Sequence, residues 1–101
     1  MDILDIHTIT KTFHELAPRY GVDKAYLFGS YARGDADECS DVDICIDAHS
    51  PTFSLFSLGG LGAHLEERLS RNVDIICGEE SFYPKALKRY QDDKVLLYEK
   101  H

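Results

Sequence analysis

The sequence predicts an α/β fold in which helices pack on a small mixed sheet. Segments with apolar residues at helical spacing alternate with short apolar runs typical of strands. One of these runs alternates strictly between polar and apolar residues, which indicates a strand with a core face and a polar face. With 101 residues and 44% apolar content, the chain has enough apolar surface for one core. We therefore expect residues 1–101 to form a single domain.

The first helix is expected over residues 5–20. Apolar residues recur there with helical spacing, at Ile6, Ile9, Phe13, Leu16 and Tyr20. Asp5 suits the N-cap, and Gly21 can end the helix in a left-handed conformation. Pro18 is expected to disrupt the last turn, because proline lacks the backbone N–H.

Two strands follow, separated by a Gly-Ser pair and an acidic loop. Residues 25–28 form a buried strand that stops at Gly29-Ser30, and residues 31–34 fit a single helical turn. Residues 41–47 then alternate strictly. Val42, Ile44 and Ile46 lie on one face, while the other face carries Asp41, Asp43, Cys45 and Asp47.

The second half predicts another helix–strand unit and a C-terminal helix and strand. Leu58, Leu61, Leu65 and Leu69 indicate a helix, and residues 59, 60 and 62 are glycines. Glycine disfavours a helix interior, so we expect this helix to start late or to be mobile at its start. Residues 72–77 predict a strand, residues 84–91 a helix that begins at a proline, and residues 95–98 an extended segment.

Three aspartates on two predicted strands predict a metal site. Asp41 and Asp43 share one face of a strand, with their Cα atoms about 7 Å apart from the rise per residue. Asp74 lies in the middle of a later strand, where aspartate is disfavoured unless it has a partner. Carboxylates this close repel unless a cation lies between them, and Mg²⁺ takes carboxylates together with substrate phosphates.

The Gly-Ser pair predicts the other half of such a site. Gly29 allows a sharp turn and a close ligand approach, and Ser30 opens a turn whose N–H groups and hydroxyl can hold phosphate. Arg33 can contact phosphate or a partner, or it can pair with Asp35 or Asp41 to hold the loop. Phosphate opposite metal-binding carboxylates is typical of phosphoryl or nucleotidyl transfer, in which two metal ions stabilise the attacking and leaving oxygens.

Charge and cysteine content narrow the class of protein. The net charge of −7 disfavours direct contact with DNA or RNA, because an acidic surface repels phosphate backbones. Three cysteines without CxxC spacing predict free thiols in a reducing compartment, and no apolar run is long enough to span a membrane. We therefore expect a cytoplasmic protein.

The residues from Gly29 to Asp43 resemble the signature of the DNA polymerase beta-like nucleotidyltransferase superfamily. Gly29-Ser30 is followed, after ten residues, by Asp41-x-Asp43. The longer string LFGSYARGDADECSDVDI, with VDII and KVLLYE further on, is similar to the minimal nucleotidyltransferase (MNT) domain over residues 20–99. This resemblance implies that Gly29 and Ser30 hold a nucleoside triphosphate. It also implies that Asp41, Asp43 and Asp74 bind Mg²⁺.

Stand-alone MNT proteins resemble antitoxins of HEPN–MNT toxin–antitoxin pairs. The resemblance implies that the chain transfers AMP from ATP to a tyrosine of a HEPN ribonuclease toxin and so silences it, with Asp74 accepting the proton of the attacking hydroxyl. Two alternatives stay open at this point. One is nucleotidyl transfer to a small molecule, which is less expected because the sequence predicts no additional helical domain to hold the acceptor. The other is an antitoxin that acts by binding alone.

Overall fold

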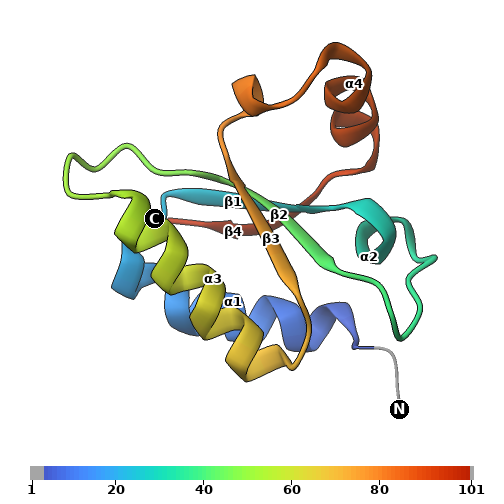
Figure 1. The fold of residues 1–101 in the computed structure, drawn as a ribbon, viewed down its shortest axis with the longest axis horizontal. Helices are drawn as coiled ribbons and strands as arrows, with labels where there is room; N and C mark the ends of the chain where they lie inside the picture. The colour runs from blue at the N-terminus through green and yellow to red at the C-terminus, as the bar shows by residue number, and fades with distance from the viewer. Residues whose placement is uncertain (1–3, 101) are drawn as a thin grey trace.

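The computed structural model describes residues 4–100 as four helices, one short 3₁₀ helix and four strands (Figure 1). The helices are α1 (Ile6–Tyr20), α2 (Gly29–Arg33), α3 (Leu55–Leu69), α4 (Pro84–Asp93) and the 3₁₀ helix η1 (Glu79–Ser81). The strands are β1 (Lys24–Phe28), β2 (Val42–Asp47), β3 (Val73–Cys77) and β4 (Val95–Glu99). Apart from η1, which was not expected from the sequence, each element overlaps a segment predicted from the sequence.

The strands form one mixed sheet in the order β3-β2-β1-β4. β1 pairs antiparallel with both β2 and β4, whereas β2 and β3 are parallel. A parallel pair needs a crossover connection, and α3 supplies it between β2 and β3. The predicted α/β fold with a small mixed sheet is therefore confirmed.

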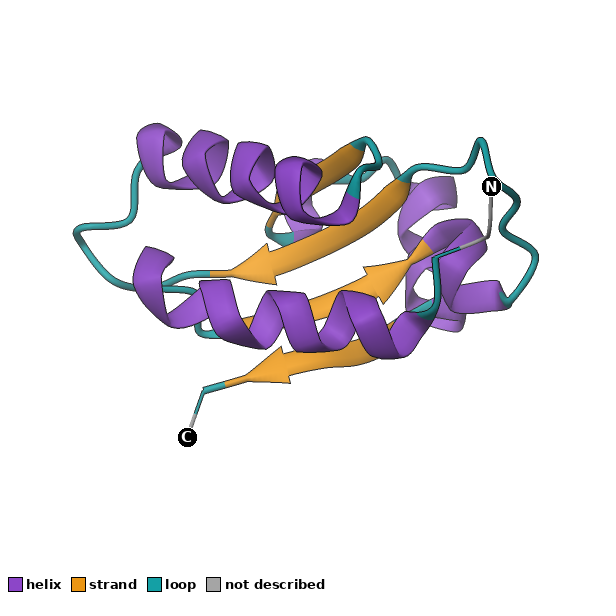
Figure 2. Ribbon diagram, turned by 90° about the horizontal axis from the view of Figure 1, so that it is seen from below, coloured by secondary structure: helices purple, strands orange, loops and turns teal. Residues whose placement is uncertain are grey.

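The two long helices cover one face of the sheet, and α4 lies on the other side (Figures 1 and 2). The core lies between the sheet and the pair α1 and α3. Fully buried residues of the two central strands fill it, namely Ala25, Leu27, Val42, Ile44 and Ile46, together with Ile9, Phe13, Leu61 and Leu65 of the helices. The face with Asp43 is covered only in part, which leaves room for a site next to α4.

The ends of α1 are set by its predicted caps. The Asp5 carboxylate accepts the Thr8 backbone N–H at 2.7 Å, and Gly21 ends the helix with φ 74°. Pro18 lies inside the helix, which continues to Tyr20, so the expected disruption of the last turn is wrong. The helix continues for only two residues beyond Pro18, and the backbone N–H of Gly21 closes its end on a carbonyl of the last turn.

The start of α3 differs from the expectation. The helix begins at Leu55, before its three glycines, so the prediction of a late start is wrong. Ser54 and Ser57 form a capping box, which supplies partners for the first N–H groups. A Cβ atom at Gly60 would lie 3.0 Å from the Tyr20 ring, so glycine lets α1 and α3 pack closely here. Helix propensity alone therefore fails to predict where α3 starts, because it includes neither the capping box nor the contact of Gly60 with Tyr20.

Between residues 4 and 100, no helix is long and apolar enough to cross a membrane.

Candidate active site

The pairing register places two of the predicted metal-binding aspartates and Phe28 in one row across the sheet. Phe28 at the end of β1 pairs with Asp43 of β2, and Asp43 pairs with Asp74 of β3. Side chains of directly paired residues point to the same face, so all three lie on the face opposite α1 and α3. Asp43 is half-buried and Asp74 is exposed. The register therefore brings together two carboxylates that are separated by a whole helix in the sequence.

Gly29 turns the chain directly beside this row. It follows Phe28, has φ 75° and begins α2. A Cβ atom at this position would collide with Oδ2 of Asp43 and would lie 3.3 Å from its Cγ. Only glycine combines this conformation with this close approach. The Gly29-Ser30 turn and the Asp43 carboxylate therefore lie side by side, and their roles in binding phosphate and metal stay predictions.

The surroundings of Asp43 make its ionisation less favourable. The pKa of Asp43 is raised to about 6, first because burial removes water from the carboxyl group, and then because Asp74 and Asp41 repel its negative charge. Arg33 opposes this rise only in part. An anionic group with too little positive charge around it fits a divalent cation, and carboxylate oxygens are the ligands that Mg²⁺ prefers.

Asp41 lies outside the strands, unlike Asp43 and Asp74. It lies one residue before β2 and is exposed, but it is close enough to act electrostatically on Asp43. Among residues 4–100, no three His, Cys, Asp or Glu side chains are gathered as a ready-made metal cluster. The donor chemistry of Asp41, Asp43 and Asp74 fits Mg²⁺, and their assignment as its ligands stays a prediction.

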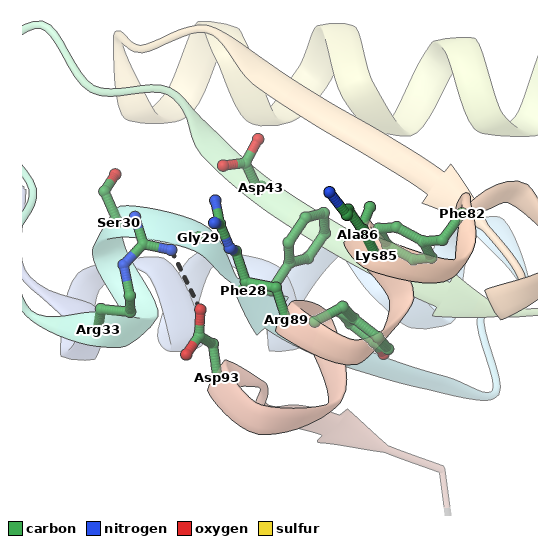
Figure 3. A pocket seen from close by; sticks show the side chains of 11 residues that line it. Phe28, Gly29, Ser30, Arg33, Asp43, Phe82, Lys85, Ala86, Arg89 and Asp93 are labelled. Carbon is green, nitrogen blue, oxygen red and sulfur yellow. Dashed lines mark hydrogen bonds and ion pairs between the residues drawn. The ribbon is translucent and has the colours of Figure 1, made fainter.

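A pocket of about 500 Å³ lies between the Gly29-Ser30 turn and α4 (Figure 3). Its first wall is formed by Phe28, Gly29, Ser30, Arg33 and Asp43. The opposite wall comes from the segment around α4 and consists of Phe82, Lys85, Ala86, Arg89, Tyr90 and Asp93. Sequence reasoning missed this second wall, because nothing local indicates that α4 lies over the carboxylate face.

Arg33 joins the two walls. Its Nε donates to Asp35 at 3.2 Å and its Nη1 donates to Asp93 of α4 at 3.1 Å. Of the partners considered from the sequence, Asp35 is confirmed, whereas its other carboxylate partner is Asp93 and not Asp41. A guanidinium has five N–H donors, so two carboxylates do not exhaust it, and Arg33 still lines the pocket.

Aromatic side chains hold α4 above the sheet. Tyr90 is the buried residue of α4, and its ring stacks on Phe82 with centroids 4.7 Å apart. Phe28 meets Tyr90 edge-on at 5.2 Å. Burial and a hydrogen bond with Cys45 raise the pKa of the Tyr90 hydroxyl, so it stays protonated. Cys45 is buried beneath it, as expected for a small packing residue.

The chain matches a known family over almost its whole length. Its fold, with a Gly-Ser turn beside paired carboxylates, is the one expected of proteins that transfer a phosphorylated group. The profile of the family described as Polymerase beta, Nucleotidyltransferase matches residues 7–101, and the chain belongs to this family.

Curated relatives carry the name protein adenylyltransferase, and two of them illustrate the similarity. One, from Methanocaldococcus jannaschii, is named "Putative protein adenylyltransferase" and is 36% identical over 83 residues, which span 82% of this chain and 84% of the relative. Protein adenylyltransferase MntA of Thermococcus cleftensis is 44% identical over 62 residues, which span 61% and 62% of the two chains.

Solved structures share the fold. One, described as a "putative minimal nucleotidyltransferase", has a TM-score of 0.75 and 26% identity, and the match covers 94% of this chain and 98% of the other. An MNT antitoxin in complex with a tri-AMPylated HEPN toxin of Shewanella oneidensis has a TM-score of 0.68 over 94% of this chain and 73% of the other. At 20% identity, this second likeness concerns the fold alone.

Proposed function

We propose that this protein is an antitoxin that transfers AMP from ATP to a tyrosine of a HEPN-domain toxin and thereby neutralises it. One observation carries the proposal: Asp43 lies directly beside the Gly29 turn, at the wall of a pocket large enough for part of a nucleotide, and Asp74 pairs with Asp43 on the neighbouring strand. Membership of the nucleotidyltransferase family supports the reaction class. The names of the relatives support a protein as the acceptor.

In this proposal, two groups of residues have different roles: one binds phosphate and the other binds metal. Backbone N–H groups and the hydroxyl of the Gly29-Ser30 turn hold phosphate, and Arg33 contributes the guanidinium donors that its two carboxylates leave over. Asp41, Asp43 and Asp74 hold Mg²⁺, as two ions. When bound, Mg²⁺ supplies positive charge for the phosphate oxygens.

The transfer step needs one base and one leaving group. The tyrosine oxygen attacks the α-phosphorus of ATP, and the bond from this phosphorus to the oxygen that bridges the α- and β-phosphates breaks. Pyrophosphate leaves with the bonding electrons, while the proton of the hydroxyl passes to Asp74. Asp74 suits this role because it is exposed, so an acceptor from another protein can reach it, and it lies beside Asp43.

The same proposal names the partner of the protein and its location in the cell. The partner is a HEPN toxin, in line with the toxin–antitoxin complexes among the solved structures of this fold. With a net charge of −7, the protein makes no direct contact with nucleic acid. It acts in the cytoplasm, away from any membrane.

The test is the intact mass of a cognate HEPN toxin after incubation with this protein, ATP and Mg²⁺. We expect the toxin to gain the mass of one or more AMP groups, and peptide mapping to place them on tyrosine. Asp43→Asn should abolish the gain, whereas Asp47→Asn, on the same face of β2, should leave it. A toxin that is silenced without any added mass would contradict the proposal and favour inhibition by binding alone.

A further inference from the structure

The second wall of the pocket carries two basic side chains that the sequence motifs do not include. Lys85 and Arg89 lie four residues apart on α4, which places them on the same side of the helix. Both line the pocket, and Figure 3 shows them reaching from α4 toward the side where Asp43 lies. Lys88, between them in sequence, does not line this pocket.

Neither cation has a counter-charge of its own. Within residues 4–100, Lys85 and Arg89 form no hydrogen bond and no ion pair. Other basic residues of the same chain are paired: Arg33 with Asp35 and Asp93, and Arg68 with Glu15 at 2.6 Å. The chain has 18 acidic residues against 11 basic ones, and Asp43 and Asp93 line the same pocket, yet no described carboxylate forms an ion pair with either cation.

This arrangement costs stability in the absence of a ligand. Two like charges four residues apart on a helix repel each other and destabilise it. Both also point into a pocket whose other cation, Arg33, is already occupied by carboxylates. A polyanion in the pocket would turn this repulsion into attraction, which is the behaviour expected of a phosphate-binding pair.

We propose that Lys85 and Arg89 bind the β- and γ-phosphates of the nucleoside triphosphate, the part that leaves as pyrophosphate. This inference rests on the proposed function for the identity of the ligand. The α-phosphate must lie beside Asp43 for transfer, so the distal phosphates extend across the pocket to α4. They carry most of the negative charge of the triphosphate, and the two free cations are the groups that complement it.

Binding of three probes tests this placement: ATP, AMP and inorganic tripolyphosphate, each with Mg²⁺, measured by calorimetry. Lys85→Gln and Arg89→Gln should each weaken ATP and tripolyphosphate by about tenfold or more, as expected for the loss of a charge-assisted hydrogen bond. AMP, which lacks the distal phosphates, should bind all variants equally. Lys88→Gln is the matched control and should leave all three affinities unchanged.

The outcomes separate this inference from the proposed function. If Lys85→Gln and Arg89→Gln keep wild-type affinity for ATP, or lose ATP and AMP to the same extent, the placement of the distal phosphates is wrong even if AMP transfer occurs. If they lose only affinity for the toxin, the pair binds an acidic protein surface and the inference is also wrong. Loss of tripolyphosphate binding in both variants supports it even in the absence of AMP transfer.

Discussion

The carboxylate of Asp43 lies against the backbone of Gly29, in the space that a side chain at residue 29 would occupy. Gly29 directly follows β1, and Asp43 lies in the neighbouring strand β2. Because Phe28, the last residue of β1, pairs with Asp43, the sheet holds Gly29 close to Asp43. The turn that holds phosphate and the carboxylate that holds metal in the proposed function are thus fixed relative to each other by the sheet register. A change at either residue should therefore affect the other.

The Gly29→Ala variant should lose both stability and ATP binding. A left-handed conformation costs a non-glycine residue about 1–2 kcal/mol, and the collision with Asp43 should add about 1–3 kcal/mol. Gly21→Ala is the matched control, because Gly21 has nearly the same φ, at 74°, and a Cβ atom there would meet nothing within 4 Å. Urea denaturation of both variants measures the difference. Equal losses of stability would show that the contact with Asp43 carries no energy.

The carboxyl group of Asp43 should titrate near pH 6 in the metal-free protein. Its pKa is raised from 3.8 to about 6 by burial and by the charges of Asp74 and Asp41. In carbon-detected NMR titrations, Asp74→Asn should therefore move this pKa downward, and Mg²⁺ should do the same if it binds here. A pKa that does not respond to Asp74→Asn would contradict the proximity of the two carboxylates.

The same shift predicts how stability depends on pH. A carboxyl group whose pKa is higher in the folded than in the unfolded state destabilises the fold once it ionises, so stability is lost as pH rises from about 4 to about 6. Metal-free Asp43→Asn should therefore be more stable than the wild type at pH 7. Below pH 4 the difference should vanish, since the carboxyl group is then protonated in both states. Urea midpoints at the two pH values provide the measurement.

Tyr90 should be the residue that holds α4 in place. It is 2% exposed and packs on Phe28 and Phe82, so Tyr90→Ala should cost about 3–5 kcal/mol of unfolding free energy or detach the helix locally. ATP affinity should fall with it, because Lys85 and Arg89 lie on the same helix. Leu87→Ala, at a half-buried position of α4, should cost much less. Hydrogen exchange of the α4 amides would reveal local detachment.

The glycines of α3 should respond differently to alanine. Gly59 is exposed and a Cβ there would meet nothing within 4 Å, so Gly59→Ala should stabilise the protein by about 0.5–1 kcal/mol. Gly60→Ala should give no such gain, because its Cβ would press on the Tyr20 ring. Thermal unfolding of the two variants separates helix propensity from packing. A gain from both substitutions would contradict the tight contact between α1 and α3.

Much of the fold can be predicted from local patterns. The alternation in residues 41–47 identifies β2 and its polar face, and the caps Asp5 and Gly21 mark both ends of α1. The start of α3 is not predicted correctly, because glycine content argues against a helix, whereas the Ser54–Ser57 capping box and the Tyr20 contact favour it. Propensity is a weak term, and a cap together with tertiary packing outweighs it.

The sequence by itself determined the chemistry of the first wall: a glycine at a sharp turn, a hydroxyl after it, and aspartates on the polar face of a strand. These features follow from local rules, since side chains alternate along a strand and glycine alone tolerates the turn. Only the tertiary structure decided that Asp74 lies beside Asp43, that Asp93 pairs with Arg33, and that Lys85 and Arg89 face the Gly29-Ser30 turn. Strand register and helix docking join residues far apart in the chain, and no local pattern encodes those distances.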